Sequence, residues 1–242
     1  MAQRTALVTG GSSGIGYAIA RTLGEAGFAV TIGARREEKL RNAAEELRGD
    51  GLEINDVVYD AASEESVIAL VRAHKDRYGG MDVLVNNAGI GIGAAVGDTQ
   101  TKYLDMQLDV NLRSTVLCTR EALPMLRESA KANDTAYIIN LASIAGRYGQ
   151  PWLSVYAATK AAIANWSNGI HKELQNDGIR VTALSPAFVE TPMTEFARQG
   201  GVEGEKMIRP EDLSSAVLWL LSLSRNVRIP EIVFERVGDE LF

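Results

Sequence analysis

The chain contains a single cysteine, Cys118, among its 242 residues, and its six prolines are scattered. One cysteine cannot form an intrachain disulfide, so Cys118 is interpreted as a small core residue in a reducing compartment. The sequence also has no apolar run of membrane-spanning length and no charged-then-apolar pattern near Met1. We therefore expect a cytoplasmic protein that makes no use of a membrane.

Basic residues are too few to favour nucleic-acid binding. The chain has 25 Lys and Arg against 31 Asp and Glu, which gives a net charge of -6, and it has no basic stripe. Affinity for nucleic acid depends largely on positive side chains that neutralise phosphates. We expect no nucleic-acid partner and no metal site. Because no linker or repeat divides the chain, one domain over residues 1–242 is predicted.

Short apolar or β-branched runs alternate with longer segments of helical periodicity. This alternation is typical of βαβ units around a parallel sheet, and it predicts an α/β fold with helices on both faces of seven mostly parallel strands. Residues 191–209 fit neither period and are interpreted as a mobile substrate lid. The predicted strands begin at Thr5, Phe28, Ile54, Met81, Ala136, Ile179 and Ile229, and the predicted helices span residues 14–26, 36–48, 63–78, 100–130, 153–176 and 210–223.

A glycine-rich turn follows the first predicted strand and opens the first helix. In a parallel sheet this is the place where a dinucleotide pyrophosphate binds, because unpaired N–H groups at the helix start donate to phosphate oxygens. The spacing T-G-x-x-x-G-x-G differs from G-x-G-x-x-G and from a P-loop. It predicts a single Rossmann-type, doubly wound domain, although a tight turn without a ligand is the alternative. The predicted phosphate-binding residues are Gly10, Ser12, Ser13, Gly14, Ile15 and Gly16.

The end of the second predicted strand points to NADP(H) as the cofactor. NAD-binding domains of this type carry an acidic residue there, whereas an arginine nearby accommodates the 2′-phosphate of NADP. Here the expected acidic position is Ala34, and Arg35 and Arg36 follow it. A guanidinium suits bidentate phosphate binding. The alternatives are a solvated charge pair at the helix start and, for Arg36, pairing with Glu37 or Glu38.

Three side chains form a candidate catalytic group. Ser143 follows the fifth predicted strand, and Tyr156 and Lys160 lie four residues apart on the next helix, hence on one face. An isolated phenol titrates near pH 10, and a neighbouring ammonium is expected to lower that pKa. We expect Tyr156 to act as general acid and base, Lys160 to tune it, and Ser143 to donate to a substrate carbonyl oxygen.

These motifs, together with Asn86-Asn87-Ala88-Gly89 after the fourth strand, resemble the short-chain dehydrogenase/reductase family over nearly the whole chain. The resemblance implies hydride transfer between NADP(H) and a small-molecule carbonyl or alcohol, by a homodimer or homotetramer. A non-catalytic dinucleotide sensor or regulator, and an epimerase or dehydratase of the same family, remain alternatives. The substrate, the stereochemistry and the preferred direction stay open.

The resemblance also assigns further residues. Asn111 matches the asparagine that interrupts the fourth helix and anchors a water leading to the lysine. Asp60 matches a residue that touches the adenine ring, and capping of the following turn explains it almost as well. Ala187 stands where the family usually has glycine, and its methyl group is expected to disturb the loop. Further cofactor contacts are expected at Asn87, Ala88, Gly89, Pro186, Val189 and Thr191.

Loop residues on the substrate side are mostly apolar or aromatic. Residues 90–96 and 147–153, with Phe188 and Met193, are expected to line the pocket, which favours a carbonyl compound with hydrophobic bulk. Arg147 either pairs with a substrate carboxylate or phosphate, or is solvated. Residues 227–235 differ from the family's usual seventh strand leading to Asp-Gly-Gly, and resemble the tails of reductases that act on small hydroxy acids and on hydroxy amino acids such as serine.

Overall fold

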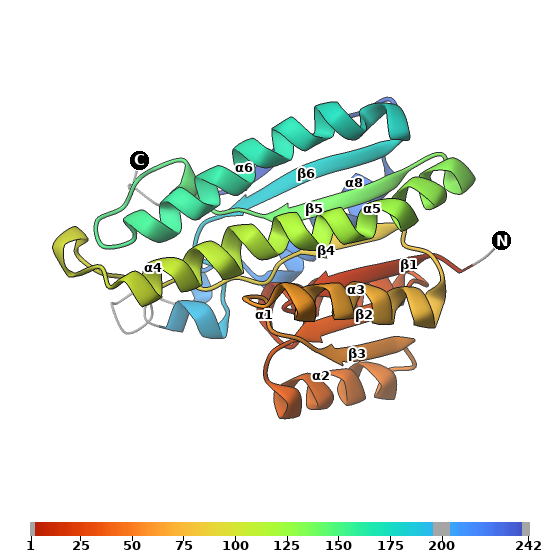
Figure 1. Cartoon of the computed structure of the whole chain (residues 1–242), viewed down its shortest axis with the longest axis horizontal. Coiled ribbons are helices and arrows are strands. Elements are labelled where there is room, and N and C mark those ends of the chain that lie inside the picture. Colours follow the sequence, from red (N-terminus) through yellow and green to blue (C-terminus); the bar gives the residue numbers. More distant parts are fainter. Residues whose placement is uncertain (1–2, 196–203, 239–242) are drawn as a thin grey trace.

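The computed structural model describes residues 3–195 and 204–238. Seven strands form one sheet in the order β3-β2-β1-β4-β5-β6-β7, and each neighbouring pair is parallel (Figure 1). The predicted α/β fold is confirmed, and residues 196–203 of the predicted lid lie outside the described residues. The strands are β1 (Thr5–Thr9), β2 (Ala29–Ala34), β3 (Ile54–Val58), β4 (Val83–Asn86), β5 (Ala136–Leu141), β6 (Ile179–Pro186) and β7 (Glu231–Phe234).

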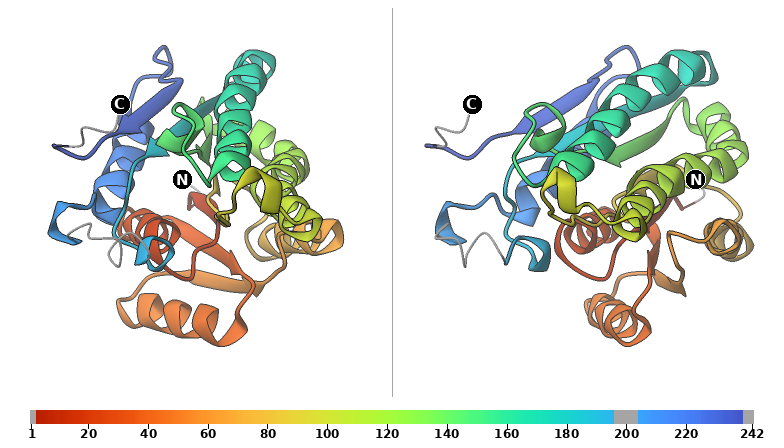
Figure 2. Two further views of the ribbon diagram at one scale, coloured as in Figure 1. Left: turned by 90° about the vertical axis from the view of Figure 1, so that its left-hand side faces the viewer. Right: turned by 60° about the vertical axis from the view of Figure 1, so that its left-hand side comes forward.

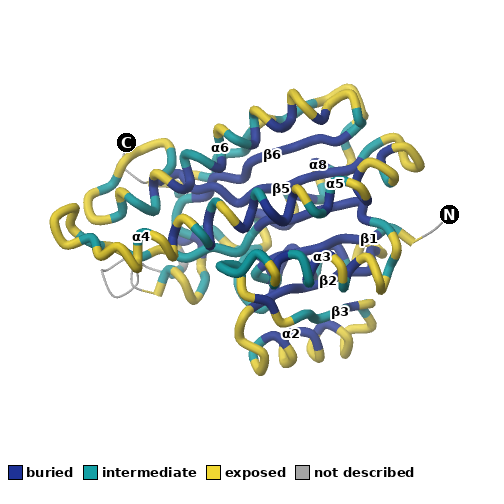
Figure 3. Tube along the Cα trace, viewed as in Figure 1, coloured by how far each residue is buried: buried dark blue, intermediate teal, exposed yellow. Residues whose placement is uncertain are grey.

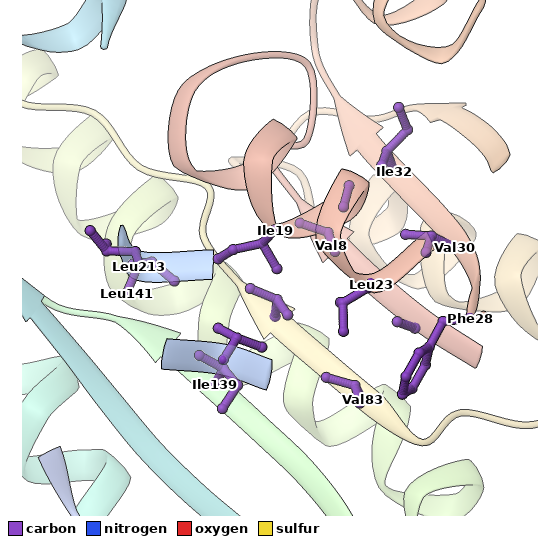
Figure 4. Close-up of a cluster of buried hydrophobic side chains, with 14 of the residues drawn as sticks. Val8, Ile19, Leu23, Phe28, Val30, Ile32, Val83, Ile139, Leu141 and Leu213 are labelled. Carbon is purple, nitrogen blue, oxygen red and sulfur yellow. The ribbon is translucent and has the colours of Figure 1, made fainter. Parts of the chain in front are cut away.

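Helices cover both faces of the sheet (Figures 1 and 2). Apolar side chains of α1, α2 and α8 pack on one face, and those of α3, α5 and α6 pack on the other. Successive strand residues alternate between the two clusters, because side chains of a strand point to opposite faces. Figure 4 shows Val8, Ile19 and Val83 in the first cluster, whereas Leu7 and Leu84 belong to the second. The helices are α1 (Gly14–Glu25), α2 (Glu37–Gly49), α3 (Glu64–Tyr78), α4 (Thr101–Leu108), α5 (Ser114–Asn133), α6 (Ser154–Leu174) and α8 (Pro210–Ser222).

The strand order reverses at β1, which lies between β2 and β4. Leu7 is in register with Thr31 on one side and with Leu84 on the other. Open α/β sheets bind ligands at the carboxyl edge next to such a reversal of strand order. Every predicted cofactor and catalytic segment that follows a strand reaches this edge.

The segment predicted as one helix over residues 100–130 is divided. A π-helical turn, Asp109–Arg113, separates α4 from α5 and contains Asn111. An extra residue in the turn releases one position of the regular hydrogen-bond ladder, and such turns are frequent at functional sites. The interruption of the helix expected at Asn111 is confirmed, and it takes the form of this π-helical turn.

The last strand begins two residues later than predicted, at Glu231 rather than Ile229. The preceding residues still contact β6, since Ala183 N donates to Pro230 O at 3.0 Å and the hydroxyl of Thr182 donates to Ile229 O at 2.7 Å. Proline has no N–H to donate, so the regular ladder starts only after Pro230.

Cys118 lies in the core, as the sequence predicted. Its side chain is buried, and burial raises the pKa of the thiol to about 12. The inner strands β1, β2, β4, β5 and β6 are buried along their whole length, whereas the edge strands β3 and β7 are partly exposed and the outer faces of the helices are exposed (Figure 3). Among residues 3–195 and 204–238, no helix combines the length and the apolar character needed to cross a bilayer.

His74 on α3 is fully buried with both ring nitrogens bonded. Nδ1 lies 2.8 Å from the hydroxyl of Thr31, and Nε2 lies 2.9 Å from the carbonyl oxygen of Gly80. Since a carbonyl only accepts, Nε2 carries the proton and Nδ1 accepts from Thr31. Burial lowers the pKa of His74 to about 4. The folded protein thus holds the neutral ring, whereas the unfolded chain binds a proton near the ordinary pKa of about 6.5.

We expect the free energy of unfolding to be highest above pH 6.5 and to fall as the pH drops toward 4. The loss from His74 is about 3 kcal/mol over this window, because each pH unit between the two pKa values contributes about 1.4 kcal/mol. Urea unfolding at a series of pH values, compared between the unmodified chain and His74→Gln, measures this slope. The pKa of His171 is also lowered, mainly by burial. His171→Gln therefore measures how much this second histidine contributes to the pH dependence of the free energy of unfolding. An unchanged slope in His74→Gln would contradict the assignment.

Candidate active site

Side chains from the loop after β4, the π-helical turn, β5 and α6 meet at the carboxyl edge of the sheet. Ser143 follows β5 and begins a short 3₁₀ turn, Ile144–Gly146, while Tyr156 and Lys160 come from the first turns of α6. The Lys160 Nζ atom lies 5.7 Å from the centre of the Tyr156 ring. The structure therefore places the predicted phenol and amine side by side.

Asn111 connects the π-helical turn to its neighbours. The Ile90 N–H donates to Asn111 Oδ1 at 2.8 Å, and Asn111 Nδ2 donates to Ile90 O at 2.8 Å and to the Thr159 hydroxyl at 3.1 Å. A Cβ atom at Gly89 would lie 3.4 Å from both Asn111 Oδ1 and Lys160 Nζ. Asn111 thus fixes the loop after β4 against α6 next to the lysine, and its expected role in holding a water stays a prediction.

Lys160 is buried, and its ammonium donates to the carbonyl oxygen of Leu141 at 2.7 Å. Burial lowers its pKa to about 8. At neutral pH this amine is still mostly protonated, but it gives up its proton far more readily than an exposed lysine. Leu141 is the last residue of β5, so the strand that leads to Ser143 also orients the lysine.

The pKa of Tyr156 moves in the opposite direction to that expected from the sequence. Burial of the phenol raises it above the usual value, and an interaction with the Ser143 hydroxyl opposes that rise only partly. The expectation of a lowered phenol pKa is therefore wrong for the protein's own groups. The physical reason is that Lys160 directs its ammonium to Leu141 O, so desolvation of the phenolate dominates.

The glycine-rich turn is packed against the loop after β4. A Cβ atom at Gly16 would lie 2.4 Å from Asn87 Nδ2 and 2.5 Å from Gly10 O, and Gly10 has a φ of 68°. Asn87 Nδ2 donates to Thr9 O at 2.9 Å and to Gly10 O at 3.2 Å. These contacts require glycine and bring the two predicted cofactor loops together.

The first turn of α1 is suited to an anion. Ser13 is the N-cap, but its side chain makes no capping hydrogen bond, and the first turn has no acidic residue. The leading N–H groups of a helix have no partner within it and carry the positive end of its dipole. A Cβ atom at Gly14 would lie 2.9 Å from Thr191 Cγ2, so the segment after β6 also reaches this turn. Ser12 and Ile15 are half-buried beside it.

Arg35 and Arg36 are exposed directly after β2, whose last residue, Ala34, is buried. Within the described part of the chain, neither guanidinium forms an ion pair. Glu37, the partner considered for Arg36, instead binds Arg41 at 2.8 Å. Two unpaired cations therefore stand at the mouth of the predicted cofactor crevice.

Asp60 has the turn-capping contact that the sequence left open. Its Oδ1 accepts from the Ala62 N–H at 3.0 Å, and its own N–H donates to the Ser66 hydroxyl at 2.8 Å. A contact with adenine stays a prediction. Ala187, by contrast, causes no strain, since Asp134 and Trp152 are the non-glycine residues with positive φ in the described ranges. The loop disturbance expected from the missing glycine is not found.

Thr9 holds the Asn-Asn-Ala-Gly turn through its hydroxyl, a role that the sequence did not reveal. Its Oγ1 atom accepts from the N–H groups of Asn87 at 2.9 Å and Ala88 at 3.0 Å. Val189 is buried and forms an isolated parallel bridge with Ile208, which ties the two described ends of the predicted lid. Pro186 ends β6, and its carbonyl oxygen accepts from the Ser143 hydroxyl at 3.4 Å.

The two predicted substrate loops touch each other. Ala94 N donates to Trp152 O at 2.8 Å, and both residues line a shallow hollow that also includes Ile92, Tyr103 and Val155. Phe188 and Met193 are not among the residues that line it. Gln107 on α4, buried and missed by sequence reasoning, accepts from the Ile92 N–H at 3.1 Å.

Arg147 is exposed, as one of the two expectations had it, but it also forms an ion pair with Glu231 of β7. The anion comes from a residue 84 positions away. No local pattern in the sequence could have indicated that partner. A contact of Arg147 with a substrate carboxylate or phosphate stays a prediction.

Comparison with known proteins shows the family of the chain. The family model described as short chain dehydrogenase matches residues 4–201. A curated oxidoreductase of Staphylococcus aureus (strain USA300) is 34% identical over 98% of this chain and 99% of its own length. A putative ketoacyl reductase of monensin polyketide synthesis from Streptomyces virginiae is 41% identical over 81% of this chain and 75% of its own.

Solved structures show the same fold with a bound nicotinamide dinucleotide. A variant of actinorhodin polyketide ketoreductase with NADPH has a TM-score of 0.87 and 32% identity, covering 97% of both chains. The 3-ketoacyl-(acyl-carrier-protein) reductase of Brucella melitensis, with NADH, has a TM-score of 0.87 and 29% identity, covering 96% of both. The chain belongs to the short-chain dehydrogenase/reductase family and is an oxidoreductase of that family.

Proposed function

We propose that the chain is an NADP(H)-dependent carbonyl reductase or alcohol dehydrogenase with Tyr156 as its general acid and base. The observation that carries the proposal is the meeting of Ser143, Tyr156 and Lys160 beside Gly89, at the edge where the glycine-rich turn also lies. Relatives that reduce polyketide or ketoacyl groups support a ketone with hydrophobic bulk as the substrate.

The residues of the crevice fit a dinucleotide. Cβ atoms at Gly10 and Gly16 would clash with Asn87 and one at Gly14 with Thr191, so the glycines let the turn pack between the loops after β4 and β6, at the place where this kind of fold binds a pyrophosphate. Arg35 and Arg36 offer cations to a 2′-phosphate, and Ala34 offers no carboxylate to a ribose hydroxyl. We therefore assign NADP(H) rather than NAD(H), although relatives have been solved with either type.

The chain's own groups supply the proton chemistry of carbonyl reduction. Bound NADPH would supply the hydride. Ser143 donates a hydrogen bond to the substrate oxygen, and the Tyr156 Oη–H gives its proton to that oxygen. A raised phenol pKa suits this direction, since the acid must be protonated at neutral pH. Lys160, with a pKa of about 8, carries a proton close to the phenol, where it is available for the next turnover.

NADPH oxidation, followed at 340 nm with a panel of aromatic and aliphatic ketones and 3-ketoacyl esters, tests the proposal. We expect turnover of at least one apolar ketone, and product analysis to show the matching alcohol. Cofactor binding without turnover across the panel would favour the sensor, and an isomerised or dehydrated product would favour an epimerase or dehydratase. A cytoplasmic location and assembly into a dimer or tetramer remain part of this proposal.

A further inference from the structure

Ser143, the 3₁₀ turn Ile144–Gly146 and Arg147 together are called the serine turn. The ion pair between Arg147 and Glu231 joins this turn to the last strand, β7. Arg147 Nε lies 3.1 Å from Glu231 Oε1, and Nη2 lies 2.5 Å from Oε2, which is the two-pronged geometry that guanidinium and carboxylate favour. The Ser185 hydroxyl also donates to Glu231 Oε1, at 2.5 Å. One carboxylate thus binds a residue of the serine turn and a residue of β6.

The serine turn is held at three places. At its start, Ser143 Oγ accepts from the Ala145 N–H at 3.2 Å and donates to Pro186 O at 3.4 Å. In its middle, a Cβ atom at Gly146 would lie 2.6 Å from Ala161 N, so the turn rests directly on the α6 backbone beside Lys160. At its end, Arg147 is bound to Glu231.

Glu231 also restrains the strand that the serine hydroxyl contacts. Its partner Ser185 is fully buried and directly precedes Pro186, whose carbonyl oxygen accepts from Ser143. The carboxylate is mostly buried, with 15% of its side chain exposed, and the Arg147 guanidinium holds its pKa below the usual range. Glu231 is therefore charged at neutral pH. It binds Arg147 on the serine turn and Ser185 on β6, the two segments that fix the position of Ser143.

We propose that Arg147 and Glu231 are positioning residues that set the Ser143 hydroxyl for carbonyl reduction. The inference rests on the proposed function, and neither side chain is assigned a contact with substrate or cofactor. The hydroxyl's hydrogen bond to Pro186 O is long, so it fixes the serine weakly, and the course of the turn decides where Oγ points. Catalytic groups must be held within about 0.5 Å of their productive position.

The effect of breaking the pair separates positioning from a structural role. The Arg147 side chain is 46% exposed, so water can solvate its guanidinium when Glu231 is neutral, whereas the Glu231 side chain is only 15% exposed. We expect Glu231→Gln and Arg147→Gln each to lower kcat for ketone reduction about tenfold, because small displacements of a catalytic group are costly. The KM for NADPH changes little in both variants, and the melting temperature changes little in Glu231→Gln, which leaves no unpaired carboxylate. Arg147→Lys, which keeps the charge but loses the two-pronged geometry, gives an intermediate kcat.

The ion pair of Arg127 with Asp177 supplies a matched control. Arg127 is 47% exposed and lies 2.8 Å from its partner, at the opposite edge of the sheet. Arg127→Gln removes a guanidinium of the same exposure and should leave kcat within about twofold of the unmodified chain.

The decisive measurement combines Glu231→Gln with Ser143→Ala. If Glu231 acts through the serine, the double variant has the kcat of Ser143→Ala alone, because coupled residues are not additive. A full tenfold further loss in the double variant, or an unchanged kcat in both single variants, overturns the inference while the proposed function stands. Absence of ketone reduction by the unmodified chain overturns the proposed function and this inference with it.

Discussion

Tyr156→Phe is expected to lower kcat for NADPH-dependent ketone reduction by about 100- to 10,000-fold, the range typical of a lost general acid. The change removes one oxygen and keeps the ring, which packs against the loop after β4, where a Cβ atom at Gly91 would lie 3.6 Å from the ring's Cδ2 atom. The dissociation constant for NADPH, measured by quenching of protein fluorescence, should change by less than about threefold.

Tyr78→Phe is the matched control for this variant. Tyr78 ends α3, far along the chain from Tyr156, and its ring contacts the His74 ring edge-on. The loss of its hydroxyl should leave kcat unchanged. A Tyr156→Phe variant that keeps more than about a tenth of the original kcat would show that another group delivers the proton.

Arg35→Ala is expected to raise the KM for NADPH by about 10- to 100-fold, because hydrogen bonds to a charged group contribute about 1.5–3 kcal/mol. The KM for NADH should stay within about twofold, since NADH has no 2′-phosphate to lose a contact. Initial rates with both cofactors at saturating ketone measure the two effects in one preparation.

Arg41→Ala controls for a general loss of positive charge near the crevice. Arg41 lies on α2, the helix that follows Arg35 and Arg36, and is already paired with Glu37. Its removal should leave the KM for both cofactors unchanged. An equal rise for NADPH and NADH in Arg35→Ala would refute the assignment of this residue to the phosphate.

The elements of this fold were predictable where the pattern is local. The strand run of residues 83–85 is apolar throughout because helices cover both faces, and that composition is visible without any structure. The boundary at Glu231 was missed because it depends on Pro230, which lacks an N–H, and on contacts made with β6. The interruption at Asn111 was expected only from the family resemblance, since a single asparagine only mildly disfavours a helix.

The candidate site likewise has features that local sequence predicts and features that depend on tertiary contacts. Residues four apart on one helix, such as Tyr156 and Lys160, are brought together by helix geometry alone. The direction of their pKa shifts was not predictable, because it depends on Leu141 O as the acceptor for the lysine and on the depth at which the phenol is buried. Thr9 and Gln107 were missed for a related reason, since a hydroxyl or amide reveals its partner only when distant loops are in place.

The sequence by itself determined the parallel sheet, the position of the glycine-rich turn and the placing of Tyr156 and Lys160 on one helix face, because periodicity and motif spacing act over a few residues. Only the tertiary structure decided which charges are paired. Arg147 and Arg35 both follow a strand or turn, yet Arg147 pairs with Glu231, whereas Arg35 forms no ion pair with a described carboxylate. Coulomb energy depends on distance in space, and the sheet order that sets this distance brings β7 beside β6 after more than 40 intervening residues.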